Sequence, residues 1–158
     1  MAGFTHFDDQ GRSIMVDVSD KAITKRTATA TGTIAMSIAC YEAVEQGQIK
    51  KGDVLEVARL AAIMGTKKTH ELIPLCHNIP IEKVSIDFDK NDTECEITVR
   101  CTVTTTGKTG VEMEALTGVT IALLTIYDMC KAIDKAMIIK HSYLQEKKGG
   151  KSDFSATQ

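Results

Sequence analysis

The sequence lacks tryptophan, is poor in aromatic residues and contains no long uninterrupted apolar segment. Aromatic residues make up only 4% of the chain, so the core has to be built from aliphatic side chains, methionine and alanine. No segment has the composition expected of a transmembrane helix, and the N-terminus lacks the basic and apolar regions of a secretion signal. We therefore expect a cytoplasmic protein without a membrane partner.

An excess of positive charge is also absent. The formal net charge is −2 and the isoelectric point is about 6.1. Binding to a nucleic-acid backbone requires a basic face, so we expect no nucleic-acid partner. A small anion held by a local group of lysines remains compatible with this composition.

The cysteines have no paired spacing. Five of them stand at positions 40, 76, 95, 101 and 130, without a CxxC pair, and the chain contains no HExxH motif. Zinc sites and redox dithiols usually need such spacings, so we predict reduced thiols and no metal site.

The order of the predicted elements indicates an α+β fold. Alternating or Thr-rich segments predict strands over 13–18, 25–36, 82–89, 94–106 and 136–145. Capped apolar segments predict helices over 37–47, 53–65, 67–72 and 112–133. This order is close to the split βαβ plan, so we predict a ferredoxin-like sandwich whose antiparallel sheet is covered by helices on one face. The other face would be rich in Thr and Ser, which favours an oligomer.

The length of 158 residues predicts one domain with a genuine core. We expect a mobile leader over 1–12, a single catalytic α+β domain over 13–146 and a flexible C-terminal tail over 147–158. The two ends are polar and contain glycine, which is typical of poorly ordered termini.

The most chemically dense segment is TKKTHELIPLCHN at 66–78. His77 follows the break at Pro74, in a loop position where binding groups concentrate. A substrate contact and a hydrogen-bonded structural histidine both fit His77. Metal ligation is disfavoured because Pro74 prevents one regular helix from presenting both His70 and His77.

Two lysines, Lys67 and Lys68, begin this segment. Together with Lys50, Lys51 and Arg26 they could neutralise a phosphate chain. The alternative is a solvated helix start. A lysine pair at a helix N-terminus opposes the helix dipole, which slightly favours anion binding.

Two glutamates, Glu112 and Glu114, flank Met113 at the start of the long helix. They complement the helix dipole, so stabilisation of the helix is one interpretation. In a regular helix their side chains would point about 200° apart. A shared pocket would therefore require an irregular helix start.

Asp128 and Lys131 lie one turn apart near the end of the same helix, after several apolar turns. An unpaired buried charge costs several kcal/mol, so the two could simply neutralise each other. The functional alternative is an acid/base pair whose pKa values are shifted by partial burial.

Five motifs occur in order along the chain: MVDVS at 15–19, LIPLCH ending at 77, GVEMEALTGV at 110–119, YDMCKA at 127–132 and GGKS at 149–152. Together they closely resemble the MoaC family, the cyclic pyranopterin monophosphate synthases of molybdenum cofactor biosynthesis. The resemblance spans residues 13–152. The chain departs from the common GGKSG ending, because Asp153 follows Ser152.

The resemblance implies a ferredoxin-like subunit in a homo-oligomer, a hexamer built from dimers with active sites at subunit interfaces. It implies a lyase that rearranges 3',8-cyclo-7,8-dihydro-GTP to cyclic pyranopterin monophosphate and releases pyrophosphate. A radical SAM GTP cyclase would be the functional partner that supplies this triphosphate. No cofactor is evident, although Mg²⁺ could accompany the phosphates.

Carried over by position, the resemblance assigns acid/base catalysis to Asp128 and Lys131. The further candidates for proton transfer or phosphate contact are Lys51 and Lys67. The expected substrate-binding residues are Leu75, Cys76, His77, Glu112, Met113 and Glu114, with Arg26 as a phosphate contact. The alternative function, from another class, is a non-catalytic oligomeric nucleotide-binding module in which Asp128 and Lys131 form only a structural ion pair.

Overall fold

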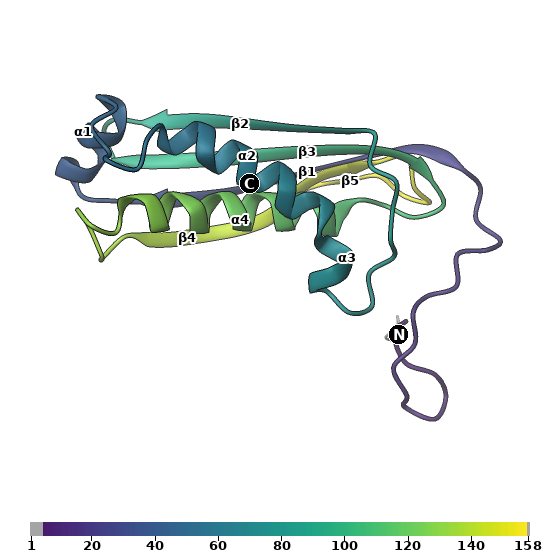
Figure 1. Ribbon diagram of the computed structural model, residues 1–158. Helices are drawn as coiled ribbons and strands as arrows, with labels where there is room; N and C mark the ends of the chain where they lie inside the picture. Colours follow the sequence, from purple (N-terminus) through teal and green to yellow (C-terminus); the bar gives the residue numbers. More distant parts are fainter. Residues whose placement is uncertain (1–4, 158) are drawn as a thin grey trace.

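The structure, a computed structural model, describes residues 5–157, and these form an antiparallel sheet with helices packed against it (Figure 1). The strands are β1 (Thr24–Ala35), β2 (Lys83–Asn91), β3 (Glu96–Gly107), β4 (Ile138–Lys148) and β5 (Phe154–Ser155), in the spatial order β2-β3-β1-β4-β5. The helices are α1 (Ile38–Glu45), α2 (Val54–Lys67), α3 (Thr69–Leu72) and α4 (Glu112–Cys130). The predicted α+β class is confirmed.

Two helices begin at the caps that the sequence predicts. The Ser37 side chain accepts a hydrogen bond from the backbone N–H of Cys40, at 3.3 Å. The Asp53 carboxylate accepts from Leu55 and Glu56, each at 3.1 Å. These bonds satisfy backbone donors that the first helical turn leaves free, so both helix starts are fixed locally.

The core lies between the helices and one face of the sheet. On β1, Ala28, Ala30 and Ile34 are at most 1% exposed and alternate along this face. β3 contributes a matching row of fully buried residues, Ile97, Val99, Cys101 and Val103. This alternation produces the period-two pattern that the sequence shows.

The opposite face of the sheet is rich in threonine, as predicted. The hydroxyl groups of Thr29 and Thr102 lie 2.9 Å apart, and those of Thr33 and Thr98 lie 2.7 Å apart. These pairs link β1 to β3 and satisfy polar groups on the face that lacks helices.

Helix α4 packs closely on the sheet where glycines remove side-chain volume. A Cβ at Gly32 would lie 2.7 Å from Val119 Cγ1, and a Cβ at Gly118 would lie 2.6 Å from Thr66 Oγ1 and 2.7 Å from Cys101 Sγ. By length and composition α4 could cross a membrane, but nine of its 19 residues are buried in the fold, as expected of a core helix.

The N-terminal segment differs from the prediction. Residues 13–18 do not form the predicted strand, because Ser13 makes only an isolated bridge to Phe7 and residues 14–18 have no regular secondary structure. The alternation instead places Val16 and Val18 in the wall of a pocket. Residues 1–4 of the expected leader lie outside the described residues.

The C-terminal segment contains an unpredicted strand. β4 continues through Lys148, and β5 returns beside it, with Lys147 opposite Phe154. The backbone N–H of Ala156 also donates to the Gln145 carbonyl, at 2.8 Å. A strand of two residues is too short to show an alternating pattern in the sequence. Only its pairing with β4 in the structure identifies it. Residue 158 of the expected tail lies outside the described residues.

Apolar residues recur along α2 at helical spacing: Val54, Val57, Leu60, Ala61 and Met64. Val54 at the helix start is buried, but most of this stripe faces outward. Val57, Leu60 and Met64 are 40%, 61% and 59% exposed, whereas Ala58 and Ala62 are fully buried. The alanines face inward because α2 and α4 approach closely. The stripe therefore leaves an apolar helix face exposed among the residues that the structure describes.

Replacing Gly118 by alanine tests the packing of α4. Alanine favours a helix by about 1 kcal/mol relative to glycine. The contacts with Thr66 and Cys101 should outweigh this gain and lower the free energy of unfolding by about 1–3 kcal/mol. Urea unfolding measures the change, with Thr120→Ala at an exposed position of α4 as the control. A Gly118→Ala protein as stable as the wild type would contradict the close packing.

Candidate active site

Three of the predicted catalytic residues form one charged cluster at the C-terminal end of α4. Lys131 Nζ lies 2.7 Å from Asp128 Oδ1, and Lys51 Nζ lies 3.0 Å from Asp128 Oδ2. Lys51 Nζ also donates to the backbone carbonyl of Asp128, at 2.9 Å. The segment between α1 and α2 thus brings Lys51 to α4, and the carboxylate lies between two ammonium groups.

The expected partial burial of this pair is wrong for the single subunit. The side chains of Asp128 and Lys131 are 56% and 51% exposed. They lie on the outward side of α4, which also carries the exposed Leu124. Hydrogen bonds from Lys131 and then Lys51 lower the pKa of Asp128, and the hydrogen bond to Asp128 raises the pKa of Lys131. At neutral pH, Asp128 is therefore ionised and Lys131 is protonated.

Most of the predicted substrate-binding residues line one pocket at the other end of α4. The connector after α3 lies against the first turn of α4 and encloses a volume of about 340 Å³. The predicted residues in its wall are Leu75, Cys76, His77, Glu112, Met113 and Glu114. Two motifs that are distant in sequence thus form a single pocket.

Glu114 is the buried carboxyl group of this pocket. It is 4% exposed, and burial raises its pKa to about 7, with a smaller contribution from the charge of Glu112. Burial, followed by the charge of Glu114, also raises the pKa of the Cys76 thiol. Near neutral pH, Glu114 can therefore hold or release a proton, while Cys76 stays a neutral thiol.

Glu112 reaches the same pocket by folding back toward the residues that precede the helix. A Cβ at Gly110 would collide with the Glu112 carboxylate, so the glycine leaves room for it. Glu112 Oε1 lies 3.1 Å from Lys147 Nζ. Both Glu112 and Glu114 line the pocket although α4 is helical from Glu112 onward, so the irregular start that the sequence suggested is not required.

His77 is oriented by the segment that was predicted as a strand. Its Nε2 lies 2.8 Å from the carbonyl oxygen of Val16. A carbonyl only accepts hydrogen bonds, so Nε2 carries the proton and donates. This bond fits the structural interpretation of His77, and the ring also lines the pocket as a substrate contact would.

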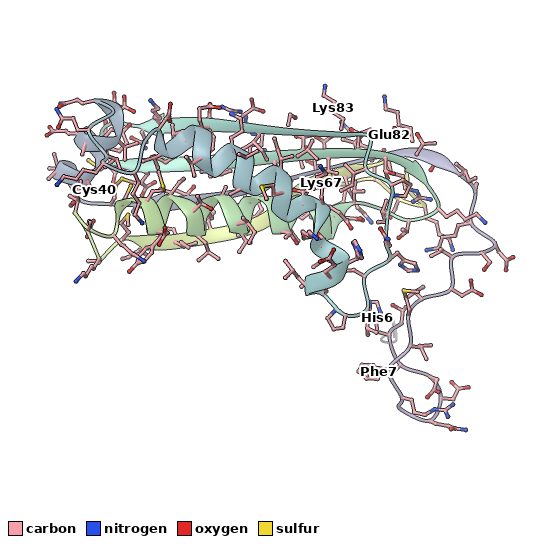
Figure 2. The ribbon with its side chains drawn as sticks, in the orientation of Figure 1. His6, Phe7, Cys40, Lys67, Glu82 and Lys83 are labelled. Atoms are coloured by element: carbon pink, nitrogen blue, oxygen red, sulfur yellow. The ribbon has the colours of Figure 1, made fainter. Side chains whose placement is uncertain are left out.

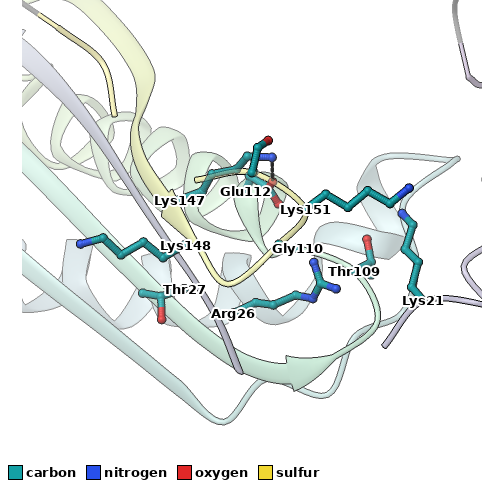
Figure 3. Close-up of a pocket in the computed structure, with 11 residues that line it drawn as sticks. Lys21, Arg26, Thr27, Thr109, Gly110, Glu112, Lys147, Lys148 and Lys151 are labelled. Carbon is teal, nitrogen blue, oxygen red and sulfur yellow. Dashed lines mark ion pairs between the residues drawn. The ribbon is translucent and has the colours of Figure 1, made fainter. Parts of the chain in front are cut away.

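Arg26 lies in a neighbouring pocket with lysines that were not identified from the sequence. This pocket encloses about 270 Å³ and includes Lys21, Lys147 and Lys151 (Figure 3). Lys147 pairs with Glu112, whereas Lys21, Arg26 and Lys151 have no ion-pair partner within residues 5–157. Glu112 lines the same pocket, and Asp17 and Asp20 line an adjoining one that shares these three cations. None of these carboxylates pairs with Lys21, Arg26 or Lys151, and converging cations that form no ion pair favour binding of an anion.

The two pockets adjoin, and we refer to them together as the groove. They share Lys21, Thr109, Gly110 and Glu112 in their walls. Of the cations that were missed, Lys151 stands in the GGKS motif, which could have indicated it, whereas Lys21 and Lys147 stand in no charged motif. Among the described residues, no group of three or more His, Cys, Asp or Glu side chains could hold a metal ion.

The groove and the charged cluster do not meet within one subunit. Glu112 and Asp128 lie at opposite ends of α4, about 24 Å apart along the helix axis at 1.5 Å per residue. Lys67 belongs to the groove end, because the neighbouring Thr66 hydroxyl donates to the Glu114 carbonyl at 3.3 Å. Figure 2 shows Lys67 well separated from Cys40 at the α1 end. The predicted catalytic set is therefore divided between the two ends.

The segments that build the groove and the cluster match a known family. The sequence profile of the MoaC family matches residues 15–150. The chain belongs to the MoaC family. Relatives named "Cyclic pyranopterin monophosphate synthase" include a protein of Clostridium botulinum (strain Alaska E43 / Type E3), 57% identical over 152 residues, and one of Lysinibacillus sphaericus (strain C3-41), 54% identical over 154 residues. Each alignment covers 96% of both chains, so the match includes both ends of α4 in this MoaC chain.

The raised pKa of Glu114 predicts a pH-dependent stability difference. The folded state binds a proton up to about pH 7, whereas the unfolded carboxyl releases it near pH 4.5. The contribution of Glu114 to the free energy of unfolding is therefore fully present below pH 4.5 and is lost as the pH rises through 7. Relative to Glu114→Gln, the wild type should lose about 3 kcal/mol between these limits. Urea unfolding of both proteins at several pH values checks this, and a constant difference would contradict it.

Proposed function

We propose that this MoaC chain is a cyclic pyranopterin monophosphate synthase of molybdenum cofactor biosynthesis. It would rearrange 3',8-cyclo-7,8-dihydro-GTP and release pyrophosphate, as a phosphorus–oxygen lyase. The observation that carries the proposal is the 57% identity, over nearly the whole chain, to a protein of that name. A radical SAM GTP cyclase would supply the substrate.

The shape and charge of the groove support this substrate class. One part offers His77, Cys76 and the protonatable Glu114 to a purine-derived ring. Its basic part offers Arg26 and Lys151 to the phosphates. Pyrophosphate departs with increased negative charge, and preformed cations stabilise such charge in the transition state. Mg²⁺ bound to the phosphates would add to this effect.

The protonation states of the charged cluster suggest its chemical roles. Asp128 is ionised and can accept a proton, so it acts as the general base. Lys131 is protonated and can donate a proton or stabilise a developing anion. Lys51, held against Asp128, and Lys67, at the groove end, are the further candidates for proton transfer or phosphate contact.

The separation along α4 leads us to propose that each active site is built from two subunits. The Asp128 cluster of one ferredoxin-like subunit would complete the groove of another, within a hexamer built from dimers. The outward stripe of Val57, Leu60 and Met64, with Leu124 on α4 at 50% exposure, offers an apolar surface for such contacts. Burial at the interface would also supply the desolvation that Asp128 lacks in the single subunit.

A non-catalytic oligomeric nucleotide-binding module is the second candidate function. The observation that favours it is the mutual pairing of Asp128 with Lys51 and Lys131, which a purely structural role would also explain. In either case we propose a cytoplasmic protein, in keeping with its composition.

Replacing Asp128 by asparagine separates the two candidates. Asparagine keeps the shape but cannot take up the proton, so kcat for pyrophosphate release from the cyclised GTP substrate should fall about 10²- to 10⁴-fold. The subunit should stay folded, because the Asp128 side chain is exposed in it. The matched control is Asp87→Asn, an exposed carboxylate on β2, which should retain wild-type kcat.

The measurement is a pyrophosphate-release assay, with circular dichroism and size-exclusion chromatography to verify the fold. Turnover of Asp128→Asn near the wild-type rate would exclude the assigned role. An unmodified protein that binds the substrate without turnover would favour the binding module.

A further inference from the structure

The last part of the chain forms a hairpin at the basic end of the groove. Lys147 of β4 pairs with Phe154 of β5, and the turn between them brings Gly150, Lys151 and Ser152 into the pocket wall. In Figure 3, the ammonium group of Lys151 points toward that of Lys21. We refer to residues 147–155 as the C-terminal hairpin.

The turn of the C-terminal hairpin is fixed from two sides at Gly149. Its carbonyl accepts a hydrogen bond from Thr24 Oγ1 at 2.7 Å, and its N–H donates to Asp153 Oδ1 at 3.0 Å. Gly149 has a φ of +87°, and a Cβ there would collide with the Lys25 carbonyl. Only glycine fits this position, so the turn has a defined geometry.

The hairpin lies directly against Arg26. A Cβ at Gly150 would come within 3.2 Å of Arg26 Nη1, so the turn passes close to the guanidinium group. Arg26 Nε is held by the Gly107 carbonyl at 2.9 Å, which fixes its side chain in the pocket. The position of Lys151 relative to Arg26 therefore depends on the turn that Asp153 closes.

We propose that Asp153 is a positioning residue that holds Lys151 over the basic pocket, where Lys21, Arg26 and Lys151 together bind the pyrophosphate end of the substrate. The identity of the substrate rests on the proposed function. The proposed binding of a polyphosphate rests only on the three cations, which have no ion-pair partner among residues 5–157, and on the hydrogen bond that closes the turn.

If Asp153 acted only through its charge, it would weaken the binding of a polyphosphate, whereas the positioning role strengthens it. A carboxylate beside a cationic pocket repels a polyphosphate, so its removal should tighten binding. The pKa of Lys148, raised chiefly by its hydrogen bond to Glu146, is raised further by the charge of Asp153, which shows that this charge reaches the basic segment. Loss of the hydrogen bond to Gly149 should instead release Lys151 and weaken binding.

Calorimetric titration of the full chain with inorganic pyrophosphate separates these effects. Asp153→Ala removes both the charge and the acceptor, and its Kd should rise about tenfold, as should that of Lys151→Ala. Asp153→Asn keeps the oxygen that accepts from Gly149, so its Kd should equal or fall below that of the wild type. The matched controls are Asp87→Ala and Lys83→Ala on β2, which should bind as the wild type does.

Several results would overturn the inference: a wild-type or tighter Kd for Asp153→Ala, an unchanged Kd for Lys151→Ala, or an Asp153→Asn protein as weak as Asp153→Ala. These outcomes do not depend on turnover. If the chain binds pyrophosphate as described but does not convert the cyclised GTP, the proposed function fails and the positioning role of Asp153 stands.

Discussion

The packing of α4 on the sheet fixes the distance between the groove and the charged cluster. The proposed active site depends on this distance. Gly118 and Gly32 allow the helix to lie so close to the sheet and to α2 that it cannot slide or tilt without collision. The helix therefore acts as a rigid spacer between Glu114 in the groove and Asp128 in the charged cluster. A substrate in the groove cannot reach Asp128 of the same subunit, which is why we propose that a partner supplies it.

The two carboxyl groups at the ends of this spacer have opposite environments. Glu114 is buried beside a thiol, and its pKa is raised to about 7. Asp128 is exposed between two lysines, and its pKa is lowered. Paired carboxyls with divergent pKa values can divide the roles of proton donor and proton acceptor. The fold thus creates this difference through burial at one end of a helix and ion pairing at the other.

Local patterns predicted the secondary structure well, because caps and alternation are properties of short segments. The Asp53 cap and the alternation of β1 and β3 illustrate this. The apolar stripe of α2 was more difficult to interpret, because periodicity shows that one face is apolar but not whether it meets its own sheet or another chain. The exposure of Asp128 could not be predicted for the same reason, because the sequence does not show whether the end of α4 is covered by its own subunit.

The motifs identified most of the groove, but of its basic end only Arg26 was predicted as a phosphate contact. Lys21 and Lys151 meet there only because β5 pairs with β4 and because Asp153 closes the turn at Gly149. Such contacts between distant segments leave no periodic signal. The angular separation of Glu112 and Glu114 led to the wrong expectation that a shared pocket needs an irregular helix start. The long side chain of Glu112 folds back over Gly110, so its carboxylate does not lie in the direction in which its Cβ leaves the helix.

The most direct measurement of the central claim is complementation between two inactive subunits. Asp128→Asn and Glu114→Gln chains, each inactive alone, are co-expressed with different tags, and mixed oligomers are isolated. If each site joins the groove of one subunit to the charged cluster of another, about a quarter of the sites regain both intact halves, and pyrophosphate release returns in proportion. Co-expression of Asp128→Asn with Lys131→Ala, which alter the same cluster, should stay inactive. Mixed oligomers of the first pair that remain inactive would contradict an active site shared between subunits.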